Sequence, residues 1–190
     1  MPRTLPYVVA AFHTDHPVYN RAIARLKASL VAHDLPHLIK TLPSSNKWRL
    51  ATRYKPTLVR TMLEEVAPLD VLYLDADSEV LLYPSLFEHF EGSFGVYLRP
   101  GKELWSAILY VKNDERGREW ARVWEESVEE FPRWHDQTCL QHIVDVYAET
   151  IGGIQALPEN YSCKAGKVKP STVIAQYQIR SEFLEGGGTL

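Results

Sequence analysis

The sequence predicts an α/β domain with a mainly parallel, mixed sheet flanked by helices. Apolar segments of strand length alternate with segments of helical periodicity through the first half of the chain, as in βαβ units. The segments YVVAAF at 7–12 and VLYLD at 71–75 are nearly continuous apolar runs, typical of strands buried on both faces. The chain has 190 residues, of which 45% are apolar and 24% are charged, so it is long enough for one domain with its own core.

The first half of the chain is predicted to alternate strands and helices. Prolines favour the helix boundaries, because proline has no backbone N–H and fits only the first turn of a helix. In order, we expect a strand at 7–12, a polar loop at 13–17, a helix up to about Asp34, a strand at 37–41, a turn-rich loop at 43–48, a helix from near Pro56 to Pro68, and a strand at 71–75.

The second half is predicted to contain shorter strands, and these look antiparallel, so we expect a mixed edge on the sheet. Asp114 is a candidate N-cap for one helix, and the glycines at 152–153 end another. No linker or repeat interrupts the chain, so residues 1–190 are predicted to form one domain. In order, we expect a helical turn at 86–90, strands at 94–98 and 108–111, helices from Asp114 and from 134–137, strands at 154–157 and 173–179, and a flexible tail at 185–190.

Composition excludes several classes of protein. The formal net charge of −3 provides no overall basic surface for nucleic acid. Cys139 and Cys163 form no cluster of the metal or disulfide type, so both are expected to be free thiols in a reducing compartment. The apolar stretch near the N-terminus is too short for a signal peptide or a membrane span. We therefore expect a cytoplasmic protein.

The segment LYLDAD places two carboxylates, Asp75 and Asp77, at the end of a predicted strand. Like charges this close repel each other, and each loses hydration near the edge of a sheet, so a bound divalent cation is the natural compensation. Acids one residue apart are common by themselves, and the pair also fits a solvated turn. His13 and Thr14 follow another predicted strand, and the carboxyl ends of parallel strands are where ligands bind in such sheets.

Segments along nearly the whole chain resemble nucleotide-diphospho-sugar transferases, which are glycosyltransferases of the GT-A fold, and in particular the small microbial and phage members. Each segment is degenerate, but their order and spacing together make the resemblance specific. The segments are the first strand with its polar loop and Tyr19, the helix with Leu26, Ser29 and Leu30, Trp48 with Thr52 and Lys55-Pro56, LYLDAD, ELWSAILY at 103–110, WHDQ at 134–137, LPENY at 157–161 and VIAQYQIRS at 173–181.

The resemblance implies a metal site that holds the diphosphate of a sugar-nucleotide donor. Asp77 would bind Mn²⁺ or Mg²⁺ directly, and Asp75 would reach the metal through water or bind the ribose. The family usually adds a histidine from a late strand, and the matching residue here is Gln176, whose neutral amide is a weaker ligand. CKAGKVKP at 163–170 resembles another late family motif, with cysteine in place of its histidine.

The resemblance also implies which residues bind the donor and its sugar. His13 and Thr14 would contact the nucleoside, and Tyr19 is either a core residue or part of the base pocket. Lys55 would contact phosphate, although a lysine at a helix start is ordinarily a surface residue.

The other predictions concern catalysis and charge. Asp136 and Gln137 would lie near the transferred sugar, with a helix cap as the alternative for Asp136; Lys164, Lys167, Lys169 and Arg180 would form a basic cluster that either contacts the diphosphate or is a solvated face.

The expected function is therefore metal-dependent transfer of a sugar, with a UDP-sugar as the expected donor and retention of configuration favoured. The acceptor is open among a glycan, a small molecule, a protein and a modified base. Because the domain is short, a partner chain or a second copy in a homo-oligomer is a candidate source of the acceptor surface. Two alternatives are a non-catalytic sugar-nucleotide binder, motivated by Gln176, and a phosphatase of the haloacid-dehalogenase type, whose strand also ends in Asp-x-Asp.

Overall fold

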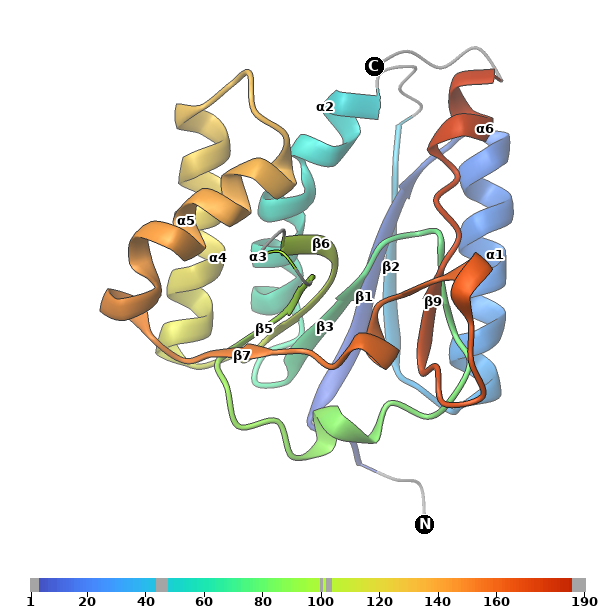
Figure 1. Ribbon diagram of the computed structural model, residues 1–190, viewed down its shortest axis with the longest axis horizontal. Coiled ribbons are helices and arrows are strands. Elements are labelled where there is room, and N and C mark those ends of the chain that lie inside the picture. Colours follow the sequence, from blue (N-terminus) through green and yellow to red (C-terminus); the bar gives the residue numbers. More distant parts are fainter. Residues whose placement is uncertain (1–3, 44–47, 100, 102–103, 186–190) are drawn as a thin grey trace.

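A computed structural model describes residues 4–43, 48–99, 101 and 104–185 (Figure 1). At its centre is a six-stranded sheet with helices on both faces. Its strands are β1 (Tyr7–Thr14), β2 (His37–Leu42), β3 (Asp70–Leu74), β5 (Phe94–Leu98), β6 (Leu104–Val111) and β7 (Ile154–Ala156), and their order across the sheet is β2-β1-β3-β6-β5-β7.

Five of these strands point the same way. Strand β1 is parallel to β2 and β3, β5 is parallel to β7, and β6 is antiparallel to both of its neighbours. The predicted mainly parallel α/β sheet is thus confirmed, but the expected mixed edge is wrong, because the antiparallel strand lies inside the sheet between β3 and β5. Its residues from Ser106 to Val111 are all buried, as an interior strand covered on both faces requires.

The helices divide between the two faces of the sheet. Helix α1 packs on one face, where the side chains of Val9 and Ala11 join it, and α3, α4 and α5 pack on the other, which receives Ala10 and Phe12. This alternation follows from the two-residue period of a strand and explains why the run at 7–12 is apolar throughout. The helices are α1 (Pro17–Ala32), α2 (Trp48–Arg53), α3 (Lys55–Glu65), α4 (Glu115–Glu130), α5 (Asp136–Ile151) and α6 (Arg180–Glu185).

Several predicted helix boundaries are confirmed. Asp114 is the N-cap of α4, and its Oδ1 accepts a hydrogen bond from the Gly117 N–H at 2.7 Å. Gly152 follows α5 with a φ of 69°, a conformation that glycine adopts without the steric cost of a Cβ. The expected helical turn near residue 86 is the 3₁₀ helix η1 (Ser85–Glu88).

A second, three-stranded sheet follows the predicted metal-binding segment. It consists of β4 (Ser78–Val80), β9 (Ile174–Gln176) and β8 (Cys163–Lys164), in the order β4-β9-β8. Strand β9 runs antiparallel to β4 and pairs Gln176 with Ser78. A residue far along the chain is thereby fixed next to Asp77.

Other parts of the fold were not predicted. Helix α2 follows the loop predicted at 43–48, in a segment for which no helix was predicted. Strand β6 begins at Leu104, four residues before the start of the strand predicted at 108–111. The strand expected at 173–179 is limited to Ile174–Gln176, and helix α6 follows it. This helix includes Glu185, and the remainder of the predicted tail, 186–190, lies outside the described residues.

Both cysteines are free thiols, as predicted; Cys139 is buried and Cys163 is half-buried. Within the described ranges, no helix combines the length and the apolar character needed to cross a membrane.

Candidate active site

A cavity of about 770 Å³ opens at the carboxyl ends of β1 and β3. A volume of this size is typical of ligand pockets. Nine residues proposed from the sequence for binding of the nucleoside, phosphate, metal or sugar line this cavity: His13, Thr14, Tyr19, Lys55, Asp75, Asp77, Asp136, Gln137 and Gln176.

These residues reach one place because several elements end or begin there. Asp75 directly follows β3, and its N–H donates to the Ala107 carbonyl of β6 at 2.9 Å, which continues the ladder beyond the strand. Lys55 is the first residue of α3, and Asp136 is the first residue of α5. Gln176 is the last residue of β9.

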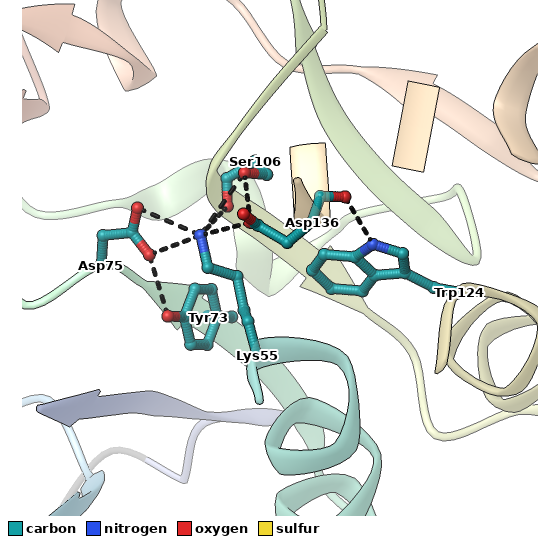
Figure 2. A network of polar contacts seen from close by, with 6 residues as sticks. All are labelled: Lys55, Tyr73, Asp75, Ser106, Trp124 and Asp136. Atoms are coloured by element: carbon teal, nitrogen blue, oxygen red, sulfur yellow. Dashed lines mark hydrogen bonds and ion pairs between the residues drawn. The ribbon is translucent and has the colours of Figure 1, made fainter. Parts of the chain in front are cut away.

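Lys55 is at the centre of a buried polar network (Figure 2). Its Nζ lies 2.9 Å from Oδ1 of Asp75 and 3.1 Å from Oδ2 of Asp136. The same ammonium lies 3.4 Å from both the Oγ and the carbonyl oxygen of Ser106. The Lys55 side chain is only 4% exposed. The alternative of a surface lysine is therefore wrong, and phosphate contact by Lys55 stays a prediction.

The charge state of Lys55 follows from its neighbours. Burial by itself lowers the pKa of a lysine, but the charges of Asp136 and Asp75 outweigh this effect and hold the pKa of Lys55 above its ordinary value. Lys55 therefore remains an ammonium ion, and it compensates two carboxylates that would otherwise repel each other across the cavity.

Asp136 is held at both its side chain and its backbone. Its Oδ2 accepts hydrogen bonds from Ser106 Oγ at 3.0 Å and from Lys55, and its carbonyl accepts one from the indole N–H of Trp124 at 2.9 Å (Figure 2). The N-cap position of α5 belongs to His135. The alternative of a capping aspartate at 136 is thus wrong, and the carboxylate of Asp136 belongs to the cavity.

Asp75 also accepts a hydrogen bond from a tyrosine of β3, the strand that it follows. The hydroxyl of Tyr73 donates to Asp75 Oδ1 at 2.9 Å. Burial, reinforced by the charge of Asp75, raises the pKa of Tyr73 well above its ordinary value, so this hydroxyl keeps its proton. A carboxylate offers about four lone pairs, and Tyr73 and Lys55 use most of those on Asp75. Asp75 can still bind one further group through Oδ2.

Asp77 is held from the late segment of the chain. Its carboxylate accepts a hydrogen bond from the Ile179 N–H at 3.2 Å, and its carbonyl accepts one from the Tyr177 N–H at 3.0 Å. Burial, together with the nearby charge of Asp75, raises the pKa of Asp77. A carboxylate in this situation gains from a bound cation, which favours the ionised form.

Gln176 is buried in the cavity wall with only 2% of its surface exposed, and its Nε2 finds no hydrogen-bond partner within the described residues. An amide in this position is suited to a ligand that enters the cavity. The amide oxygen and nitrogen exchange places by a flip of the group, so either can face the cavity.

The residues present fit a hard divalent cation that takes oxygen ligands. Asp75 Oδ2, the Asp77 carboxylate and the Gln176 amide are the candidate donors, and Mg²⁺ and Mn²⁺ accept such donors together with water. No group of three or more histidine, cysteine, aspartate or glutamate side chains suited to a metal occurs in the part of the chain that the structure describes. The third ligand from the protein would therefore be the amide.

The predicted nucleoside-binding residues also line the cavity. His13 is anchored by Thr41, whose Oγ1 lies 3.0 Å from Nε2 of His13. Thr14 is buried, and its Oγ1 has no partner among the described residues. Tyr19 lies on α1 with its ring 5.2 Å from the ring of Phe183. Tyr19 lines the cavity, as the base-pocket alternative requires.

Several residues of the site were not assigned a role from the sequence. Tyr73 had a usable signal, because residues two apart in a strand share a face, and it shares one with Asp75. Ser106 lies in ELWSAILY, one of the segments that resemble the transferase family, but its hydrogen bond to Asp136 had no signal in the sequence, because it joins residues 30 positions apart. The contact of Trp124 with Asp136 had no signal either. The predicted basic cluster is absent from this cavity: Lys164, Lys167 and Lys169 line a second one, and the side chain of Arg180 lies outside the described residues.

Comparison with known proteins identifies the fold. No family model matches the chain, and no curated protein matches it. A glycosyltransferase involved in the glycosylation of the major capsid of PBCV-1 is similar in structure, with a TM-score of 0.65 and 11% identity over 95% of this chain and 98% of that chain.

The glycosyltransferase GlyE of Streptococcus pneumoniae TIGR4 is also similar. Its TM-score is 0.62 at 15% identity, and that of its apo form is 0.63 at 16%. The match covers 95% of this chain and 60% of GlyE, so this chain spans about 60% of that protein. At these identities the likeness shows the fold alone, and it confirms the glycosyltransferase fold predicted from the sequence.

Proposed function

We propose that the protein is a glycosyltransferase that moves a sugar from a nucleotide-diphosphate donor, a UDP-sugar, to an acceptor hydroxyl. The observation that carries this proposal is the convergence of Asp75, Asp77, Asp136 and buried Lys55 on one cavity at the strand ends of a glycosyltransferase fold. Such cavities hold the ligand in open α/β sheets.

The roles of the residues follow from their positions in the cavity. His13 and Thr14, at the end of β1, bind the nucleoside. Asp77, Asp75 and Gln176 hold Mn²⁺ or Mg²⁺. The bound cation would neutralise the charge that develops on the leaving diphosphate. Asp136 and Gln137, at the start of α5, bind the hydroxyls of the transferred sugar.

Lys55 sets the geometry between the two groups of acids. It contacts Asp75 on the metal side and Asp136 on the sugar side, so it fixes the distance between those carboxylates. Pre-organisation of this kind lowers the reorganisation needed in the transition state.

The transfer exchanges one bond for another. The acceptor oxygen forms a bond to the anomeric carbon, the bond from that carbon to the phosphate oxygen breaks, and the acceptor proton passes to the leaving diphosphate. Asp136 Oδ2 is already engaged by Lys55 and Ser106, so it is placed to bind sugar rather than to remove that proton. This arrangement favours retention of configuration with assistance from the leaving group.

Binding of nucleoside diphosphates tests the proposal. We expect thermal unfolding to shift upward with UDP and Mn²⁺ together, and less with either alone, because a ligand that binds only the folded state stabilises it. Incubation with UDP-sugars should then release UDP. Absence of any metal-dependent shift across the common nucleoside diphosphates would refute the proposal.

A sugar-nucleotide binder without turnover is the second candidate, favoured by the neutral Gln176 in the place of a histidine. Mn²⁺-dependent binding of UDP without release of UDP from any UDP-sugar would select it. The phosphatase alternative is not favoured, because the solved structures that share this fold are glycosyltransferases.

A further inference from the structure

A second cavity of about 650 Å³ lies next to the candidate active site. Trp105 lines both cavities. The two are also joined through the small sheet, where Lys164 of the second cavity pairs with Gln176 of the first across β8 and β9. A ligand in the second cavity would therefore approach the first at the Trp105 side chain.

The second cavity is strongly basic, although the whole chain has a formal net charge of −3. Four cationic side chains line it, those of Arg99, Lys164, Lys167 and Lys169, and among the described lining residues the only carboxylate is that of Glu159. None of the three lysines forms an ion pair with a described residue. The charges of these three lysines are therefore available to a ligand.

The wall of the cavity also contains groups suited to a polar ligand. Ser162 is 3% exposed, and its Oγ has no hydrogen-bond partner within the described residues. Arg99 and Lys164 lie 5.3 and 5.8 Å from the ring centre of Trp105, within the range of a cation–π contact. The cavity thus combines an aromatic surface, an unsatisfied buried hydroxyl and an excess of positive charge.

We propose that the second cavity binds the acceptor, and that this acceptor is a small hydroxyl compound with a phosphomonoester group. The assignment rests on the proposed glycosyltransferase function. A phosphomonoester carries a charge of about −1.5 to −2 at neutral pH and three acceptor oxygens, which matches several cations better than a single carboxylate would. Its phosphate would lie among the lysines, with the reacting hydroxyl directed past Trp105 towards Asp136.

The alternative occupant of the basic cavity is the diphosphate of the donor itself. The first cavity already has candidate metal ligands for that diphosphate, and each cavity is large enough to hold a ligand of its own. The two assignments predict different binding behaviour: an acceptor site binds phosphate without affecting the donor, whereas a donor subsite changes affinity for the nucleotide.

The test variant is the double substitution Lys167→Ala and Lys169→Ala. Both residues are exposed, so the fold is expected to survive. The control is Lys27→Ala with Lys112→Ala, which removes the same charge from residues that do not line the cavity. Calorimetry would measure binding of inorganic phosphate, and separately of UDP with Mn²⁺, to wild type and both variants. A transfer assay would compare glucose 6-phosphate and other sugar phosphates with the neutral sugars as acceptors.

We expect phosphate affinity to fall about tenfold or more in the test variant, since each lost charge-assisted contact weakens binding substantially. The affinity for UDP with Mn²⁺ should change by less than about twofold, as should both affinities in the control variant. Wild type should prefer phosphorylated acceptors, and the test variant should lose that preference.

Other results overturn the proposal in distinguishable ways. An equal loss of UDP affinity in the test variant would assign the lysines to the donor diphosphate. Unchanged phosphate affinity, or the same loss in the control variant, would show that the cavity binds no phosphate. If wild type binds phosphate but no nucleotide, the proposed function fails, the acceptor role fails with it, and only an anion site remains.

Discussion

The ammonium of Lys55 lies 2.9 Å from Oδ1 of Asp75, although helix α3 supplies the lysine and the end of β3 supplies the aspartate. The same ammonium contacts Asp136 at 3.1 Å, so one cation compensates two buried or half-buried carboxylates from different elements. This triad links the predicted metal segment to the predicted sugar-binding helix.

Substitution Lys55→Met should strongly destabilise the protein. It keeps most of the side-chain volume but leaves Asp75 and Asp136 without their shared cation, and breaking a buried pair in this way costs about 3–5 kcal/mol. Chemical denaturation followed by fluorescence would measure the change in the free energy of unfolding. Asp136→Asn, added to Lys55→Met, should recover part of the loss because it removes one of the unpaired charges.

Lys40→Met is the matched control for that change. Lys40 pairs with Glu65 at 2.5 Å in an exposed setting, and such pairs contribute less than about 1 kcal/mol. A similar loss of stability in both variants would show that burial of Lys55 is not what makes its contacts important.

Substitution Asp77→Asn should abolish metal-dependent binding of UDP while the free energy of unfolding stays close to wild type. The amide retains the acceptor for the Ile179 N–H but not the negative charge that a divalent cation requires. Calorimetry with UDP and Mn²⁺ would measure the loss. Glu79→Gln is the control, since Glu79 points to Tyr177 and Arg25 and does not line the cavity; equal effects in the two variants would contradict a metal role for Asp77.

Substitutions of Gln176 should weaken or strengthen metal-dependent binding of UDP, depending on the new side chain. Gln176→Leu should weaken Mn²⁺-dependent binding of UDP by roughly tenfold or more, as losses of groups at metal sites do. Gln176→Glu should strengthen it, because a carboxylate adds negative charge to the oxygen ligands that Mn²⁺ prefers. Titration of Mn²⁺ at fixed UDP would compare the variants, and an unchanged metal requirement in both would exclude Gln176 from the metal shell.

Substitution Asp114→Ala should destabilise the fold without changing nucleotide binding. Asp114 caps α4 through Gly117 and also accepts a hydrogen bond from Ser93 Oγ at 2.8 Å. Loss of an N-cap costs about 0.5–2 kcal/mol, and the second contact places this variant towards the upper end. Asp145→Ala, in the exposed face of α5, should cost less than about 0.5 kcal/mol in the same denaturation experiment.

Much of the fold was predictable because the responsible interactions are local. Asp114 caps the turn that follows it, and Gly152 ends α5 through its own backbone conformation. The run at 7–12 is apolar on both faces of β1, because helices cover both faces of the sheet. The position of Asp75 at a ligand-binding edge follows from its place directly after a buried strand, since ligands bind at the carboxyl ends of parallel strands.

The candidate site was predictable in its members but not in its contacts. The nine proposed residues do line one cavity, which the resemblance to glycosyltransferases implied. The position of β6 inside the sheet, and with it the approach of Ser106 to Lys55, was not, because strand order depends on packing between distant segments.

The alternation of strands and helices and the pair of aspartates at a strand end can be read from the sequence, and the resemblance to glycosyltransferases implies that Gln176 stands where that family has a histidine. The burial of Lys55 between Asp75 and Asp136, and the separate cavity that Lys167 and Lys169 line beyond Trp105, are visible only in the folded chain. The surroundings of a charged side chain are formed by groups that folding brings together from distant parts of the chain. The residues next to a lysine in the sequence therefore do not indicate whether it will be buried or which groups it will contact.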